Sequence, residues 1–212
     1  MRTKKEITTC LLLVVIIANG CFFPRDLKNS FQKEGFCFND KNTGLDTMIK
    51  LNGYYEFDYE FPSTHKETIN GKLKSSFGIL FFANGFALNN FFNTQKGFLG
   101  AAATYSIRND TIRILNTCGR GCQLNRAEYS WLRVINNEKL EYLAFSYVDT
   151  LSGNEMNEFK KKLIIDGESY TNGRFIKLDS LPDQQSFWIK KKKWFWCDEN
   201  EYKNWKKSYR KR

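Results

Sequence analysis

Six cysteines carry most of the side-chain chemistry that this sequence could perform. Four of them lie well inside the chain, at Cys37, Cys118, Cys122 and Cys197. A thiolate can ligate a metal, but three residues separate Cys118 from Cys122 and no second ligand pair is nearby, so we expect no metal site. In an exported chain these four cysteines predict disulfides, with three pairings open. The tidiest pairing joins Cys118 to Cys122 and Cys37 to Cys197.

Cys21 follows a segment typical of a secretion signal. A cationic stretch at residues 2–5 precedes an apolar run at residues 11–18, which is far shorter than the roughly 20 residues that span a bilayer. The cysteine directly after Gly20 makes the segment resemble a bacterial lipoprotein signal. That resemblance implies cleavage after Gly20 and attachment of acyl chains such as palmitate to Cys21. It predicts a protein anchored by lipid to the outer membrane, with the membrane face left open.

We expect no enzymatic activity and no cofactor, because the candidate catalytic residues have simpler explanations. His65 is the only histidine and lies in a polar stretch that predicts a surface loop. Asp58 and Glu60 share one face of a predicted strand, a pairing that suits glycoside hydrolysis. Their alternation with aromatic residues indicates a solvated strand face more simply.

One short pattern, Asp followed by Ser or Thr and then an apolar residue, occurs four times. Random placement would give roughly 0.3 occurrences. The pattern is similar to the O-glycosylation motif of exported Bacteroidetes proteins, which implies sugars on Thr47, Thr111, Thr150 and Ser180. The alternative is turn chemistry, since Asp-Thr favours turns that precede strands. Both interpretations place these residues at the surface.

The basic character of the chain is concentrated at its C-terminal end. Residues 187–212 hold ten Lys or Arg against three acids, a net charge of +7, whereas residues 21–186 carry only +1. We expect this end to contact an anionic lipid, lipopolysaccharide or an envelope protein. The contact residues would be Lys190, Lys191, Lys192, Lys193, Trp194 and Trp196. The alternative is that the tryptophans pack on the domain while the lysines face water; no nucleic acid is expected, because an exported lipoprotein rarely meets it.

Most of these residues must be positioned by β-strands. Tyr55, Phe57 and Tyr59 alternate with acidic residues, which predicts a strand, and Asn84-Gly85 predicts a hairpin turn. The predicted hairpins join 76–82 to 86–92, 101–108 to 111–115, 129–135 to 140–148, and 160–165 to 174–178. A short amphipathic helix is predicted to start at residues 198–201 and to place Tyr202, Trp205 and Tyr209 on one face.

The order of three short motifs carries a family resemblance. Leu51-Asn52-Gly53-Tyr54-Tyr55 opens the first strand, Phe82-Ala83-Asn84-Gly85 forms a hairpin, and Thr104–Ile107 with Asp110–Ile114 forms a later one. This order resembles the lipocalin-like lipoproteins of the Bacteroidetes, in which a Leu-x-Gly-x-Trp start precedes a strand meander; here Tyr55 takes the place of the Trp. The resemblance implies an antiparallel barrel of about eight strands that encloses one small ligand or is filled by side chains.

We therefore predict an all-β, lipocalin-like meander barrel with a short C-terminal amphipathic helix. The predicted segments are a signal peptide over 1–20, a tether over 21–48, the β domain over 49–180 and a basic aromatic segment over 181–212. The predicted function is non-catalytic binding of a small ligand or an envelope partner by a membrane-anchored lipoprotein. The alternative is a structural subunit of an outer-membrane complex that binds no small molecule.

Overall fold

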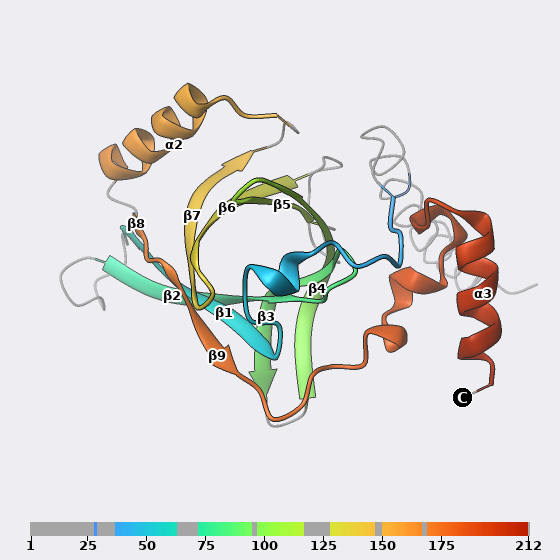
Figure 1. The fold of residues 1–212 in the computed structure, drawn as a ribbon. Helices are drawn as coiled ribbons and strands as arrows, with labels where there is room; N and C mark the ends of the chain where they lie inside the picture. The colour runs from blue at the N-terminus through green and yellow to red at the C-terminus, as the bar shows by residue number, and fades with distance from the viewer. Residues whose placement is uncertain are drawn as a thin grey trace, which may run out of the picture.

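The computed structural model describes residue 28 and residues 37–62, 72–94, 97–116, 128–146, 150–166 and 169–211. Within these residues, eight antiparallel strands close into a barrel (Figure 1), which confirms the predicted lipocalin-like meander. The strands of the ring are β1 (Gly53–Pro62), β2 (Lys72–Phe81), β3 (Phe86–Thr94), β4 (Gly97–Arg108), β5 (Thr111–Asn116), β6 (Glu128–Asn136), β7 (Lys139–Ser146) and β9 (Gly173–Lys177). Strand β1 pairs with both β2 and β9 and so closes the ring, while the two-residue strand β8 (Ser169–Tyr170) pairs with β1 alone.

Turn chemistry sets the meander, as the sequence predicts. Gly85 adopts a positive φ of 81° between β2 and β3, a conformation that costs glycine little because it has no Cβ. Asn109 adopts a φ of 56° between β4 and β5, and asparagine is one of the few other residues that tolerate this region. Both predicted hairpins are confirmed by the strand pairing on either side of these turns.

The predicted hairpin between residues 160–165 and 174–178 is wrong in its first half. Residues Gly153–Ile165 form a helix, α2, that packs against β7. Ser152 and Glu155 form a reciprocal capping box, in which each side chain accepts a hydrogen bond from the other residue's backbone N–H. Met156 and Phe159 lie three residues apart on the face that packs against the barrel. Residues 160–165, which are predicted as a strand, are therefore the end of an amphipathic helix.

The barrel interior is filled at one end by apolar side chains. Residues Leu45–Thr47 form a short 3-10 helix, η1, which lies across this opening and is drawn in blue in Figure 1. Tyr55 is fully buried beneath it and donates a hydrogen bond of 2.7 Å to the carbonyl of Asn137. The interior cluster comprises Leu45, Ile49, Tyr55, Phe57, Ile79, Phe81, Ala87, Ala103, Tyr105, Ile112, Ile114, Leu132 and Leu140.

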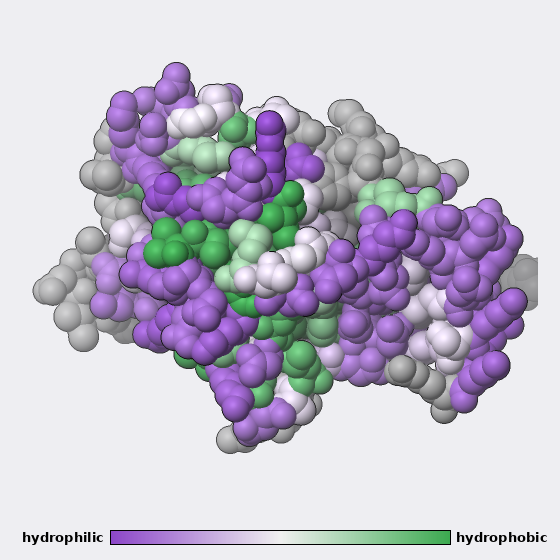
Figure 2. Space-filling model, viewed as in Figure 1, coloured by the Kyte–Doolittle hydropathy of each residue, from purple (hydrophilic) through white to green (hydrophobic). Residues whose placement is uncertain are grey.

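The C-terminal segment packs on the outside of the barrel. It consists of three 3-10 turns, η3 (Gln184–Ser186), η4 (Trp188–Lys191) and η5 (Lys193–Phe195), followed by helix α3 (Glu199–Tyr209). Asp198 caps α3 by accepting hydrogen bonds from two backbone N–H groups, which confirms the predicted helix start. Figure 2 shows hydrophilic residues over the α3 region, whereas apolar residues reach the surface over the barrel. Neither α-helix of the described residues is long and apolar enough to cross a membrane.

Candidate functional site

Polar side chains face the interior at the end of the barrel opposite η1. We call this set the polar end; it comprises Asn89, Asn116, Glu128, Ser130 and Tyr142. Cross-strand pairing establishes that they face inward, because Asn89 lies opposite Ile79, Ser130 opposite Ile114 and Tyr142 opposite Leu132, all next to interior core residues. Glu128 begins β6, whereas the turn after β6 contacts Tyr55 beneath η1, so the polar end lies away from that helix.

The polar end forms a connected hydrogen-bond network. The amide nitrogen of Asn89 donates to Oδ1 of Asn116 at 2.7 Å, and Nδ2 of Asn116 donates to Oγ of Ser130 at 3.1 Å. The Tyr142 hydroxyl lies 3.5 Å from the same Oγ. Asn116 and Ser130 are buried, so their position inside an otherwise apolar barrel costs free energy unless their hydrogen bonds are satisfied.

Stacked aromatic rings adjoin this network. The ring of Tyr142 stacks on Tyr170 with centroids 4.4 Å apart, and Tyr170 stacks on Tyr59 at 4.5 Å. Phe77 meets the edges of both Tyr142 and Tyr170. The short strand β8 supplies Tyr170, which explains why a strand of only two residues matters to the interior. Amide, hydroxyl and carboxyl groups thus lie beside a broad aromatic surface.

Burial shapes the electrostatics of the polar end. It raises the pKa of the Glu128 carboxyl, because the charged form loses solvation. It also raises the pKa of the Tyr142 hydroxyl, although the Ser130 hydrogen bond opposes the shift. The amide, hydroxyl and carboxyl groups of the polar end can hydrogen-bond to a bound molecule.

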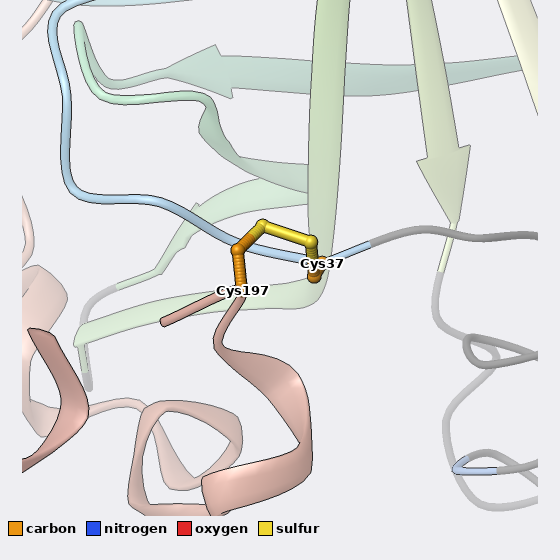
Figure 3. The surroundings of a disulfide bond; sticks show 2 residues. All are labelled: Cys37 and Cys197. Atoms are coloured by element: carbon orange, nitrogen blue, oxygen red, sulfur yellow. A yellow bond between two sulfur atoms is a disulfide. The ribbon is translucent and has the colours of Figure 1, made fainter. Parts of the chain in front are cut away.

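The structure tests only part of the cysteine predictions. Cys37 and Cys197 form a disulfide with Cα atoms 4.8 Å apart (Figure 3), as the tidiest pairing predicts. Cys21, Cys118 and Cys122 lie outside the described residues, as does His65. The lipid anchor and the second disulfide therefore stay predictions.

The four consecutive lysines of the C-terminal segment do not form one surface. Lys190 is fully buried, and its Nζ lies 4.6 Å from the Phe38 ring centroid and 5.2 Å from that of Phe86. Lys191 is exposed, with its Nζ over the Tyr209 ring, and Lys193 pairs with a glutamate of α3. Direct contact of Lys190 with an anionic surface is therefore excluded in this structure.

The predicted tryptophan anchors also pack inward. Trp196 is 6% exposed and its Nε1 donates a hydrogen bond of 2.8 Å to the carbonyl of Lys190. Trp194 is half-buried against the apolar cluster between the C-terminal segment and the outside of the barrel, which includes Phe38, Phe86 and Phe195, whereas Trp188 is 48% exposed. The expectation that Trp196 anchors the segment to a partner is wrong, because its buried ring packs edge-on against Phe38 and at tilted angles against Tyr202 and Trp205.

The candidate O-glycosylation residues are accessible to different degrees. Thr47, Thr150 and Ser180 are exposed, whereas Thr111 is half-buried and its hydroxyl lies 3.2 Å from Oδ1 of Asp110. The half-burial of Thr111 departs from the expectation of four surface sites. The modification itself stays a prediction.

Sequence reasoning missed the polar end, although a signal was present. Asn116 lies two and four residues after Ile114 and Ile112, so all three side chains are on the same face of one strand. A polar residue on an otherwise apolar strand face is a signal of a buried polar site. Asp58 and Glu60, in contrast, lie on the opposite face of β1 from Phe57, and Glu60 pairs with Lys74. No group of three His, Cys, Asp or Glu side chains within the described residues could hold a metal ion.

Comparisons with family models, with curated proteins and with solved structures each find no match to this chain.

Proposed function

We propose that this protein is a non-catalytic binding module, anchored to the outer membrane through Cys21, that holds a small amphiphilic ligand at the polar end of its barrel. The observation that carries the proposal is the buried network of Asn89, Asn116 and Ser130 inside the barrel. Apart from the hydroxyls of Tyr55 and Tyr105, the opposite end is filled by apolar side chains, so filling the barrel does not by itself require amide groups.

The chemistry of the polar end sets the class of ligand. Amide and hydroxyl groups on Asn89, Asn116 and Ser130 can hydrogen-bond one polar group of a ligand. The rings of Phe77 and Tyr170 offer apolar surface to the rest of it. A barrel of eight strands is either filled by its own side chains or holds one small molecule, so a ligand here must be small. We therefore infer a ligand with a single polar head and an apolar or aromatic body.

Binding of the neutral dye N-phenylnaphthylamine tests this proposal. We expect saturable fluorescence enhancement with the full-length protein, and a loss of about tenfold in affinity for Asn116→Leu, which removes two hydrogen-bonding groups at the centre of the network. Asn52→Leu, at an exposed position before β1, is the matched control and should leave the affinity unchanged. Circular dichroism establishes that both variants fold.

Two outcomes of the dye experiment would contradict ligand binding at the polar end. If the dye does not bind, or binds Asn116→Leu and the wild-type protein equally well, the polar end is a structural network. The alternative, a structural subunit of an outer-membrane complex without a small ligand, would then be favoured. Native mass spectrometry of protein purified from its own membrane would show whether a ligand of the inferred class accompanies it.

The lipid anchor is tested by Cys21→Ala. We expect the variant to lose palmitate labelling and to leave the membrane fraction or fail to mature, since stable anchoring requires more than one acyl chain. Cys10→Ala is the matched control, because that cysteine lies in the predicted signal and should not carry lipid. Unchanged lipid labelling of Cys21→Ala would refute the lipoprotein assignment.

An anionic lipid, lipopolysaccharide or envelope protein remains the proposed partner of the C-terminal segment. The exposed cations Lys191, Lys203, Lys207 and Arg210 support this proposal in place of the buried Lys190. Each such charge is worth about 1 kcal/mol near an anionic membrane, so binding of this kind should weaken with salt.

A further inference from the structure

A hollow of about 440 Å³ lies where the segment that leads into η1 passes strand β4. Its walls are residues 37–39 and 43 of that segment, the Asn84-Gly85 turn, residues 104–107 of β4 and Arg113 of β5. We call it the lead-in hollow. Its volume falls within the range of about 300–1,000 Å³ that is typical of small-molecule sites.

The segment that forms one wall of the lead-in hollow is held at both ends. At one end, Cys37 is bonded to Cys197 (Figure 3). At the other end, the backbone N–H of Thr43 donates to the carbonyl of Ala83 at 2.8 Å, and the Thr43 hydroxyl lies 2.9 Å from the hydroxyl of Tyr105. A wall fixed by a covalent bond and by hydrogen bonds keeps the hollow formed, which lowers the entropic cost of binding a ligand.

Thr104 brings an unpartnered hydroxyl to the lead-in hollow. It lies on the outer face of β4, because the residues on either side of it, Ala103 and Tyr105, belong to the interior cluster. Its cross-strand neighbours are the apolar residues Phe86 and Leu115, which have no hydrogen-bonding side chain. Thr104 is 3% exposed, and its Oγ1 has no hydrogen-bond partner within the described part of the chain. Because native proteins satisfy almost all buried polar groups, this hydroxyl indicates a partner that the chain does not supply.

Asn84 adds an unpartnered acceptor to the same hollow. Its Nδ2 donates to Oε1 of Gln184 at 2.8 Å and also to Oδ1 of Asp40. These two acceptors fix the orientation of the amide, because a flipped amide would set its oxygen against two other oxygens. Oδ1 of Asn84 is therefore the atom that is left over, and none of the described residues donates a hydrogen bond to it.

The two unpartnered oxygens define the chemistry of a matching ligand. The Thr104 hydroxyl can donate or accept, whereas the Asn84 side-chain oxygen can only accept. An anion that carries no hydrogen cannot satisfy Asn84. An alcohol can satisfy both residues, because each of its hydroxyl groups donates and accepts. Asn39 and Ser106, which also line the hollow, bring a further amide and a further hydroxyl, so a ligand with several hydroxyl groups matches this wall best.

We propose that the lead-in hollow binds a neutral ligand with several hydroxyl groups, of the sugar or polyol class. One hydroxyl of such a ligand donates to Oδ1 of Asn84 while a neighbouring hydroxyl pairs with that of Thr104. Both protein oxygens are covered by neighbouring atoms, so binding requires side-chain rotations, which are common at binding sites whose backbone moves little. The site is separate from the polar end, because Thr104 faces away from the barrel interior, and it does not depend on whether the barrel holds a ligand.

Methyl nuclear magnetic resonance of the full-length protein tests the proposal. The methyl groups of Thr104 and Ile107, which both line the hollow, are labelled with carbon-13 and identified through Thr104→Val and Ile107→Val. The protein is titrated with glucose, galactose, mannose and myo-inositol, and separately with cyclohexanol, a ring that carries one hydroxyl. We expect saturable shifts of both methyl resonances with at least one of the four polyols and none with cyclohexanol.

Thr104→Val separates a binding role of the hydroxyl from a structural one. The affinity measured on the Ile107 methyl should fall about tenfold, the loss expected when a ligand hydrogen bond is removed. The free energy of unfolding should not fall, because the hydroxyl has no partner to lose among the described residues. Thr111→Val is the matched control, since the Thr111 hydroxyl pairs with Asp110 and lies outside this hollow; it should leave the affinity within about twofold.

Three results would overturn the proposal. The first is the absence of a saturable shift with any of the four polyols. The second is an equal shift with cyclohexanol, which would show apolar contact alone. The third is an affinity of Thr104→Val equal to that of the wild-type protein, which would make Thr104 a packing residue whose hydroxyl serves no ligand.

Discussion

Replacing Cys37 and Cys197 together by serine is expected to lower the free energy of unfolding by about 5 kcal/mol. The disulfide joins residues 160 positions apart, so it constrains most of the unfolded chain. In the chain-entropy model a loop of this length corresponds to about 5 kcal/mol, which equals the total stability of many domains.

The contacts around the disulfide add to this expectation. The backbone N–H of Phe38 donates to the carbonyl of Phe195 at 2.7 Å, and that of Cys197 donates to the carbonyl of Phe38 at 2.8 Å. The rings of Phe38 and Phe195 stack with centroids 5.2 Å apart. Without the covalent bond, the C-terminal segment depends on these contacts alone, and we expect it to detach from the barrel before the barrel unfolds.

Urea denaturation of the oxidised wild-type protein and of the double serine variant measures the loss. Tryptophan fluorescence reports mainly the C-terminal segment, which holds four of the five tryptophans, while circular dichroism reports the barrel strands. Trp131→Phe, made in both proteins, removes the signal of the one tryptophan on the barrel. Cys118 and Cys122 remain in both proteins, so a bridge between them cannot account for the difference. Equal stabilities would show that the bond contributes no constraint beyond the aromatic packing.

Replacing Lys190 by methionine is expected to stabilise the protein at neutral pH by up to about 3 kcal/mol. Burial lowers the pKa of the Lys190 ammonium to about 8, although Asp40 and Asp183 attract the charge. A lowering of this size corresponds to about 3 kcal/mol of cost for the charged form. Methionine fills a similar volume without a charge. The Gln184 carbonyl keeps a partner in the variant, because Nδ2 of Asn84 also donates to it at 2.8 Å.

The sign of the pH dependence follows from the lowered pKa. Below pH 8 Lys190 is protonated in both the folded and the unfolded state, so the folded protein bears the whole free-energy cost of burying the charged ammonium. Between pH 8 and about 10.5 the unfolded state binds more protons, so the stability contributed by this group rises with pH. The advantage of Lys190→Met should therefore be constant below pH 8 and shrink toward zero near pH 10.5.

Urea denaturation at a series of pH values checks this, with Lys191→Met as the matched control. Lys191 is the next residue and is exposed, so its replacement should change stability by less than about 0.5 kcal/mol at every pH. Taking the difference between each variant and the wild type cancels the titration of Tyr105, whose pKa burial raises to about 12, and of other common groups. A Lys190→Met advantage that does not change with pH would contradict the proposed cause.

The sequence by itself determined the meander and its turns, because those features depend on short-range chemistry. Asn84-Gly85 and Asn109-Asp110 specify hairpins through the φ values that their residues tolerate. Alternation around Tyr55 and Phe57 specifies which face of β1 is buried. The helix at Glu199–Tyr209 was predictable for the same reason, since its cap and its aromatic face lie within a few turns.

Only the tertiary structure decided which polar side chains are buried and which residues far apart in the sequence meet. Residues 160–165 favour a strand locally, but the cap at Ser152 and the packing of Phe159 on the barrel make them a helix. Charge composition predicted an exposed lysine run, yet Lys190 is buried against Phe38, which lies 152 positions earlier in the sequence. The polar end joins residues of several strands. Short-range patterns cannot reveal such sites, because barrel closure and long-range packing determine which side chains meet.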